Sequence, residues 1–218
     1  AVSQVLALLA AGHSLALTCD AGTPAISDPG ALLVAAVRSA GFPVTPVPGP
    51  NAAVAALSAS GITAPHFLFY GFLPERAAAR RRALAALAKL PFTLIFYEAP
   101  HRITESIADL RATLGDSRRI VIARELTKLF ETLHECSLAD AESWLAADAN
   151  QRKGEFVLIL EGTDGAAEAE SGSARRALAI LLEALPLKQA VDLAAKITGG
   201  RKNELYKLAL ELKKGRES

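Results

Sequence analysis

Two loops rich in glycine and proline stand where apolar stretches of the sequence end. Asp20, Ala21, Gly22 and Thr23 follow the apolar segment 13–19, and Pro48, Gly49, Pro50, Asn51 and Ala52 close the segment 42–49. Glycine lets a backbone approach a ligand closely, and an aspartate accepts hydrogen bonds from amine or hydroxyl groups. Each loop alone is more simply explained as a tight turn, but the pair at neighbouring strand ends predicts a binding crevice.

Carboxylates and cations gather at two further strand ends. Glu98 and Arg102 lie at the end of one apolar segment, and Arg124, Glu125 and Lys128 lie at the end of another. For any one of these residues an exposed ion pair is the simpler explanation, while two such clusters in one domain point equally well to a catalytic site. We consider Glu98 and Glu125 as candidate general bases, and the three cations as candidate phosphate ligands.

Other site chemistries lack their motifs. The sequence contains neither the GxGxxG fingerprint of dinucleotide sites nor the GxxxxGK[ST] phosphate loop. The four histidines are scattered, and the run His134-Glu135-Cys136 alone does not complete a metal site. We therefore expect no metal centre and no cofactor that is held mainly by its phosphates.

The elements that must position these residues alternate along the first 66 residues. Strands are expected at 13–19 and 42–49, and helices at 30–40 and 52–60, each helix being followed by a glycine. Alternation of this kind implies parallel strands joined by helices, with ligand sites at the carboxyl ends of the strands. Both glycine-rich loops fall at such ends.

Residues 67–163 carry a second series of strands and helices. We expect extended segments at 64–74 and 130–135, strands at 92–100, 119–127 and 154–162, and helices at 77–89, 101–114 and 139–149. This series predicts a second α/β domain. Charge runs on helices usually face water, so Arg80, Arg81 and Arg82 are expected to be solvated.

Small and polar residues at 164–173 predict a linker. Leucines and alanines then recur at three- and four-residue spacing over 174–218, which predicts a small unit of three helices. The expected organisation is an α/β domain at 1–66, an α/β domain at 67–163, the linker and the helical tail.

Composition sets the broad class. The 218 residues are 51% hydrophobic and 22% charged, with a formal net charge of +1, as is typical of a folded globular protein. No apolar run reaches the roughly 18 residues of a membrane helix, and the start lacks a secretory pattern. Two cysteines make no disulfide framework. We expect a cytoplasmic protein without membrane contact, and with this net charge any nucleic-acid contact must come from local basic patches.

Five motifs occur in an order that is specific when taken together. CDAGTPAISDPG, PGPNA, FYEAPHR, ARELTKLFET and KGEFVLILEG follow one another as in ribosomal RNA small-subunit cytidine 2′-O-methyltransferases, which have the tetrapyrrole-methylase fold. The chain resembles this family over essentially all of its 218 residues. The end, LPLKQAVDLAAKITGGRKNELYKLALELKK, is similar to the helix-turn-helix tail of those enzymes.

The resemblance implies a function and a set of residues. It implies two α/β domains of the tetrapyrrole-methylase type plus the helical tail, a homodimer, and S-adenosylmethionine bound between the two domains. The substrate would be a cytidine 2′-hydroxyl of small-subunit ribosomal RNA, free or in the assembled small subunit. The residues that match cofactor contacts are Asp20, Ala21, Gly22, Thr23, Pro48, Gly49, Pro50, Asn51, Ala52, Tyr97, Ala123, Gly154 and Phe156; Arg201, Lys202 and Asn203 are tail residues that could anchor RNA.

One departure from the family concerns the first domain. The family begins with a strand, a glycine-containing TPIGNLGD-like loop and an acidic EDTR-like segment, and none of these is present in this sequence. We therefore expect an incomplete first sheet with an exposed edge.

Two other functions compete with this interpretation. A methyltransferase acting on a corrin or tetrapyrrole precursor would share the fold and the cofactor crevice, but it has no evident use for a basic helical tail. A non-catalytic nucleic-acid-binding protein would use the tail alone. An RNA enzyme accounts for both parts, because two linked modules bind one polymer more tightly than either does alone.

Overall fold

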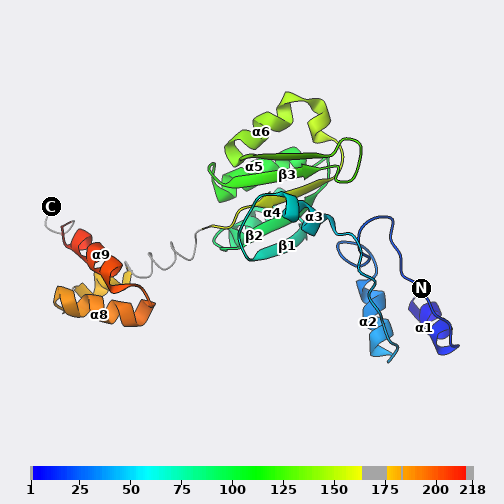
Figure 1. Cartoon of the computed structure of the whole chain (residues 1–218), viewed down its shortest axis with the longest axis horizontal. Helices are drawn as coiled ribbons and strands as arrows, with labels where there is room; N and C mark the ends of the chain where they lie inside the picture. The colour runs from blue at the N-terminus through cyan, green and yellow to red at the C-terminus, as the bar shows by residue number, and fades with distance from the viewer. Residues whose placement is uncertain (1, 164–175, 183, 215–218) are drawn as a thin grey trace. The chain divides into compact units, whose positions relative to one another are not determined.

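The computed structural model describes residues 2–163, 176–182 and 184–214 (Figure 1). The chain divides into two compact units, Ala1–Ala88 with Phe92–Glu161 and Lys89–Pro91 with Gly162–Ser218. Among the described residues no helix is long and apolar enough to cross a membrane. The linker expected at 164–173 lies outside the described residues, and the expected domain boundary between residues 66 and 67 stays a prediction.

The first unit is built on one five-stranded sheet. It lies in the order β1-β2-β5-β3-β4; β1 and β2 are parallel, and the other neighbouring pairs are antiparallel. Because β5 returns between β2 and β3, the carboxyl ends of β2 and β3 lie at the same edge of the sheet. The strands predicted from residue 64 onward are confirmed, as β1 Phe67–Phe72, β2 Thr93–Glu98, β3 Arg119–Arg124, β4 Thr132–Ser137 and β5 Phe156–Leu160.

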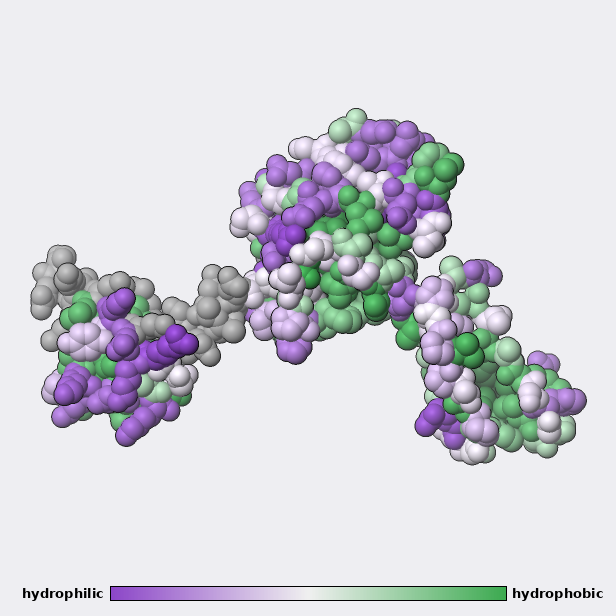
Figure 2. Space-filling view, viewed as in Figure 1, coloured by the Kyte–Doolittle hydropathy of each residue, from purple (hydrophilic) through white to green (hydrophobic). Residues whose placement is uncertain are grey.

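One face of the sheet is covered by α3, Ala52–Ala59. This helix begins at the second glycine-rich loop, so its packing ties that loop to the sheet. The buried residues of this interface are Ala53 and Ala56 of α3 with Ile95, Val121, Ala123, Val157 and Ile159 of the strands. Figure 2 shows hydrophobic atoms gathered over the part of this unit that contains α3 and β1.

The alternate side chains of the strands point to the opposite face, as the pleat requires. Phe96, Ile120 and Ile122 on that face are fully buried. The helices predicted after residue 67 in this unit are confirmed, as α4 Ala77–Leu87, α5 Ile103–Leu114 and α6 Leu138–Ala147. A short 3-10 turn follows at Ala149–Arg152. α5 packs against α4 and α6, and α6 packs against β3 and β4, so these helices form the second layer (Figure 1).

The expectation that Arg80 is solvated is wrong. Its side chain is 1% exposed, and its Nε donates to Asp109 Oδ2 of α5 at 2.6 Å. Nη2 lies 3.4 Å from Glu105, and Nη1 donates to the Glu75 carbonyl, so most of the guanidinium is paired. Arg81, by contrast, is largely exposed. Nε of Arg81 still lies 3.7 Å from Asp109 Oδ1, so Arg80 joins α4 to α5 from the interior and Arg81 joins them from the surface.

The segment before the sheet has its helices but not its strands. α1 spans Val2–Ala10, and α2 (Ala31–Ser39) and α3 confirm the two predicted helices. The strands predicted at 13–19 and 42–49 are wrong, since neither segment is assigned as a strand. An extended segment becomes a strand only by pairing, and two short segments alone make a marginal sheet at best. The incomplete first sheet is therefore not formed, and apolar residues such as Val47 are exposed.

The second unit contains the helical tail. Residues 176–182 are helical, and α8 (Leu187–Thr198) and α9 (Lys202–Lys214) follow. Gly199 ends α8 in the left-handed conformation, with φ of 74°, which lets the chain turn into α9. Apolar residues from all three helical segments form one buried cluster, consisting of Leu178, Val191, Ala194, Leu205 and Ala209. The predicted helical tail is confirmed.

Candidate functional site

The two glycine-rich loops contact each other directly. Thr23 Oγ1 donates a hydrogen bond to the Pro50 carbonyl at 2.9 Å. Gly22 adopts φ of 73°, and a Cβ at this position would have the same Pro50 oxygen as its nearest neighbour, at 4.0 Å. The sequence therefore placed these loops together correctly, even though the strands expected before them are absent.

The second loop also reaches the end of β2. Asn51 caps α3, its Oδ1 accepting hydrogen bonds from Ala53 N at 3.0 Å and from Val54 N at 3.2 Å. Ala53 N also donates to the Tyr97 hydroxyl at 3.1 Å. Burial raises the pKa of this phenol, so it stays protonated and keeps a hydrogen to donate. Both loops are thereby linked to Tyr97, the penultimate residue of β2.

A third contact joins the first loop to β1. β1 is irregular between Phe69 and Gly71, and Gly71 adopts φ of 84°. A Cβ at Gly71 would lie 3.0 Å from Ser27 Oγ, so glycine allows the first loop to approach the strand. The residues between Asp20 and Gly30 therefore touch both the second loop and the sheet.

Backbone strain is concentrated in two of the predicted loops. The non-glycine residues with positive φ that the structure describes are Ala25 (68°), Ser27 (55°), Glu125 (51°) and Thr127 (64°). Each such residue costs about 1–3 kcal/mol, and such conformations cluster at functional sites. One pair lies in the first glycine-rich loop and the other follows β3, where the second charged cluster was predicted.

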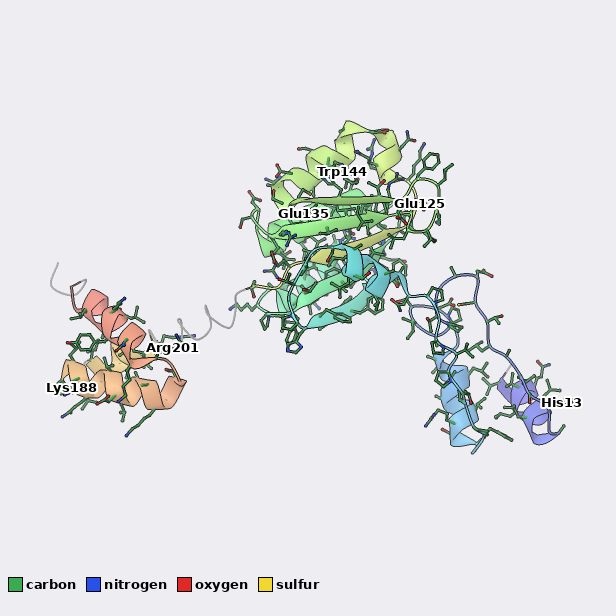
Figure 3. The ribbon with its side chains drawn as sticks, viewed as in Figure 1. His13, Glu125, Glu135, Trp144, Lys188 and Arg201 are labelled. Carbon is green, nitrogen blue, oxygen red and sulfur yellow. The ribbon has the colours of Figure 1, made fainter. Side chains whose placement is uncertain are left out.

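The two charged clusters lie at the same sheet edge. Glu98 of β2 and Arg124 of β3 both pair in register with Phe156 of β5. Leu126, just beyond β3, and Tyr97 both pack against the buried cluster that contains Ala53. The sheet thus brings the end of β2 and the loop after β3 to the place where α3 and the glycine-rich loops meet. Figure 3 shows Glu125 at this end of the sheet.

The Glu98 carboxylate is fully buried and fully engaged. Its Oε1 accepts hydrogen bonds from Arg102 Nη2 at 2.6 Å, from Arg102 Nε at 2.9 Å and from Ala99 N at 2.8 Å. Its Oε2 accepts one from the Ser106 hydroxyl at 2.5 Å. Arg102 Nη2 also donates to the Leu73 carbonyl. These contacts face α5, on the side of the sheet opposite Tyr97, and they hold Arg102 in the protein interior.

The Glu125 carboxylate is only half engaged. Its Oε1 accepts hydrogen bonds from Lys128 Nζ at 2.8 Å and from Glu155 N at 2.9 Å, and no bond is made by Oε2 within the described part of the chain. The Lys128 ammonium and the Glu155 amide lower the pKa of Glu125, and the same carboxylate raises the pKa of Lys128. A Cβ at Gly154 would lie 2.5 Å from the Glu125 side chain, so glycine makes room for this carboxylate.

Arg124 is a buried residue rather than a free cation. Its Nη1 donates to the carbonyls of Asn150 and Lys153, and its Nη2 donates to that of Phe130. These bonds fasten the chain before β4 and the turn before β5 to β3. Nε has no partner among the described residues. The geometry gives Arg124 no exposed nitrogen to offer to a phosphate.

The remaining predicted residues divide between exposed and buried positions. Asp20, Ala21, Gly22, Pro48, Gly49, Pro50 and Ala52 are exposed. Ala123 and Phe156 are buried in the core, on opposite faces of the sheet. In the tail, Arg201, Lys202 and Asn203 are exposed, and Lys202 pairs with Asp192 at 2.7 Å. The roles assigned to all these residues stay predictions.

The exposed loop residues leave room for a ligand. A Cβ at Gly22 or Gly49 would meet no protein atom closer than 3.9 Å, so the protein does not close off either position. The exposed loops offer backbone groups and the Asp20 carboxylate, and the second loop lies beside the Tyr97 hydroxyl through Ala53. Such groups suit a ligand that carries amine and hydroxyl groups. The donor set therefore fits the cofactor expected from the sequence.

Sequence inspection missed two residues that complete these clusters. Ser106 closes the cage around Glu98, and Glu155 provides a second carboxylate for Lys128, at 2.9 Å. Ser106 lies four residues after Arg102, one turn along α5, so helical spacing was a usable signal. The pairing of Glu155 with Lys128 depends on the register between β3 and β5, which no local pattern reveals.

Comparison with known proteins finds separate matches for the α/β part and for the helical tail. A family profile described as tetrapyrrole (corrin/porphyrin) methylases matches residues 1–142, and a profile described as the RsmI C-terminal HTH domain matches residues 167–213. The chain is 50% identical over 207 residues to the ribosomal RNA small subunit methyltransferase I of Escherichia coli O157:H7, with 95% of this chain and 72% of that protein covered. It is 52% identical over 203 residues to the protein of the same name from Xylella fastidiosa (strain Temecula1), with 93% and 74% covered.

Solved structures share the fold at lower identity. The methyltransferase CobJ matches with a TM-score of 0.57 and 21% identity, over 74% of this chain and 70% of that one. The cobalt precorrin-4 methyltransferase CbiF matches with a TM-score of 0.54 and 16% identity, over 72% and 68%. A uroporphyrin-III C-methyltransferase from Thermus thermophilus, solved with S-adenosylhomocysteine, matches with a TM-score of 0.50 and 19% identity, over 72% and 70%.

Proposed function

Because the chain belongs to the tetrapyrrole methylase family, and within it to the ribosomal RNA small subunit methyltransferase I group, we propose that it 2′-O-methylates a cytidine of small-subunit ribosomal RNA. It is an enzyme, and S-adenosylmethionine is its methyl donor. The choice of cytidine and of the 2′-oxygen rests on the five motifs and their order in the sequence.

The observation that carries the proposal is the chain of contacts between the loops and β2. Thr23 bonds to Pro50, Asn51 caps α3, and Ala53 at the start of α3 bonds to Tyr97. These contacts bring the glycine-rich loops and the charged sheet edge to one place. We assign cofactor contact to the exposed groups of both loops and to Tyr97. Ala123 and Phe156 would act as buried supports of this region.

S-adenosylmethionine supplies an electrophilic methyl group when it is bound. The work left to the protein is mainly to hold a ribose hydroxyl in line with that group, because alignment of two reactants accounts for a large share of such rate enhancements. The hydroxyl must also lose its proton as it attacks, and a carboxylate within hydrogen-bond reach can take it.

Glu125 is the better of the two candidate bases. Its Oε2 is free of bonds within the described chain and can accept the proton of the attacking hydroxyl, although the lowered pKa of this carboxylate makes it a weaker base. Both oxygens of Glu98 are already occupied. We therefore assign Glu98 to holding Arg102 and the start of α5 in place, as a positioning residue.

We assign the RNA contacts to Lys128 and to the tail. Lys128 is half exposed, and its raised pKa keeps it cationic. Arg102 and Arg124 are held by internal partners, so we assign them to keeping the strand ends in place and not to RNA contact. The substrate is the ribosomal RNA, free or in the small subunit, and the protein would act in the cytoplasm.

A homodimer would cover an apolar group beside β4. Leu129 is 90% exposed and Phe130 66% exposed, and Leu133 of this edge strand is also partly exposed. Contiguous apolar surface of this kind is typical of protein interfaces. Light scattering on the parent and on a Leu129→Glu variant measures the mass directly. The proposal expects a dimer that dissociates in the variant, and a parent mass of one chain contradicts it.

The function is tested by methyl transfer from labelled S-adenosylmethionine to small-subunit particles and to free ribosomal RNA. We expect incorporation into RNA, at a nucleotide that resists alkaline cleavage, because alkaline cleavage requires a free 2′-hydroxyl. Thr23→Val, which loses the bond to Pro50, should lower the rate by about tenfold or more, as expected from misplaced binding groups. Ser58→Ala removes a hydroxyl that bonds only within α3 and should leave the rate unchanged.

Other outcomes would identify the competing functions. Methyl transfer to a corrin precursor but not to RNA would make the protein a small-molecule enzyme. RNA binding without any calorimetric heat from S-adenosylmethionine would make it a non-catalytic binder. Either result contradicts the proposal.

A further inference from the structure

A hollow of about 410 Å³ lies between α8 and α9 in the second unit. Its volume falls within the range of small-ligand sites. Residues four apart share one face of a helix, which brings Lys188 and Asp192 together on α8, and Lys202 and Tyr206 together on α9. The lining consists of Lys188, Val191 and Asp192 from α8 and of Lys202, Asn203 and Tyr206 from α9.

The charge of the hollow favours an anion. Asp192 accepts a bond from Lys202 at 2.7 Å, and this ion pair, with the nearby ammonium groups of Lys188 and Lys196, lowers the pKa of Asp192. Three cations thus surround one carboxylate. Lys188 has no ionic partner among the residues that the structure describes, so its charge is available at the rim. Figure 3 shows Lys188 on α8 and Arg201 just before α9.

The same hollow contains an aromatic ring and a free amide. Tyr206 is 44% exposed, although it stands on a helix whose Leu205 and Ala209 are buried in the tail core. Within the described chain Tyr206 has no aromatic partner, and the Asn203 side chain makes no hydrogen bond. The ring face and the amide are therefore both open to a ligand. Val191, which is buried, forms an apolar floor beside them.

We propose that this hollow binds one unpaired nucleotide of the ribosomal RNA substrate, with its base stacked on Tyr206 and its phosphate beside Lys188. An aromatic face next to a cation is the arrangement by which proteins hold single-stranded nucleic acid. Asn203, which both donates and accepts hydrogen bonds, can contact a base edge, and Asp192 can accept a bond from an exocyclic amine. The inference rests on the proposed function, since it takes RNA as the polymer, and it adds a recognition site in the tail.

The test measures binding of the full protein to a fluorescent single-stranded RNA of about ten nucleotides, a span of the size that single-strand binding modules cover, and to the duplex of the same sequence. Loss of one stacking partner in Tyr206→Ala should weaken single-strand binding between about fivefold and about 150-fold. Tyr206→Phe keeps the ring and should retain the affinity. Lys188→Gln should reduce the salt dependence by about one phosphate contact.

Matched controls separate the hollow from general charge and from the methyl-transfer site. Lys207→Gln removes a positive charge from α9 outside the hollow and should weaken single strand and duplex alike, by less than Lys188→Gln. Affinity for S-adenosylmethionine, measured by calorimetry on the same samples, should be the same in Tyr206→Ala as in the parent. Circular dichroism checks that the variants keep their helices.

Several outcomes overturn the inference. Stacking in the hollow is contradicted if Tyr206→Ala binds single-stranded RNA as well as the parent does. It is also contradicted if this variant loses affinity for the single strand and for the duplex equally. Retained RNA binding with lost association to a small-subunit protein would make the hollow a peptide site. The proposed function can fail independently of this inference. If the parent binds single-stranded RNA through Tyr206 but transfers no methyl group, only the enzyme assignment is contradicted.

Discussion

Two regions of the first unit have similar sequence patterns and different structures. Between residues 67 and 161, apolar segments become strands β1 to β5, and β5 is buried along its whole length. Between residues 2 and 50, the apolar segments 13–19 and 42–49 stay unpaired, and side chains such as Val47 (84% exposed) face solvent. A pattern of alternating strands and helices therefore indicates what a segment can form, while pairing decides whether it does.

The largest expected effect in this comparison comes from shortening one apolar side chain in each region. Phe96→Ala empties a position in β2 that is 0% exposed and should lower the free energy of unfolding by about 3–5 kcal/mol. Val47→Ala, in the unpaired segment, should change it by less than about 0.5 kcal/mol. Urea unfolding followed by the fluorescence of Trp144, the single tryptophan, measures both. Equal losses would show that residues 42–49 are packed after all.

Particular residues show how far the sequence predicts this fold. The helices were predictable because glycines and caps such as Asn51 mark their ends. The central strands were predictable from short apolar runs, but strand order and register are tertiary properties. Arg80 was assigned to the wrong environment because a run of three arginines does not say which of them points inward. The pairing of both charged clusters with β5 was likewise invisible to local patterns.

A second test compares a buried ion pair with an exposed one. Glu98→Gln leaves the Arg102 guanidinium, 12% exposed, without its carboxylate, and should destabilise the protein by about 3 kcal/mol, as expected for a broken buried pair. Glu135→Gln breaks an exposed pair with Arg119 on the β3 and β4 strands and should have little effect. Urea unfolding measures both variants. Similar small effects would show that the Glu98 cage does not hold α5 in place.

The candidate site supplies a smaller, more selective comparison between two glycines. Gly154 and Gly115 have φ of 92° and 93°, so alanine should strain the backbone at both positions, by about 1–3 kcal/mol. Only at Gly154 would the new Cβ meet Glu125, which should add about 1–3 kcal/mol. The double variant Gly154→Ala with Glu125→Ala should recover the added loss. If removing the Glu125 side chain recovers nothing in the Gly154→Ala background, that side chain does not lie against this turn.

The smallest expected effect is a pH dependence. The pKa of Glu125 is lowered in the folded protein, so its contribution to stability is present above its unfolded pKa and is lost as the pH falls through the folded value. Glu125→Gln should therefore be less stable than the parent at pH 7, and the difference should shrink in acid. Lys128→Gln removes the main cause and should reduce the same dependence, leaving the part that comes from the Glu155 amide. A difference that persists unchanged through the acid range would contradict the pairing.

The central claim is that the glycine-rich loops and the end of β2 form one site for the methyl donor. Calorimetry with S-adenosylmethionine on Gly22→Ala and Gly41→Ala tests it most directly, because both glycines have positive φ (73° and 83°) and a Cβ at either would clash with no protein atom. The account predicts binding weakened by about tenfold or more in Gly22→Ala, where the Cβ would occupy ligand space, and parent-like binding in Gly41→Ala. Parent-like binding in both variants, or an equal loss in both, would contradict it.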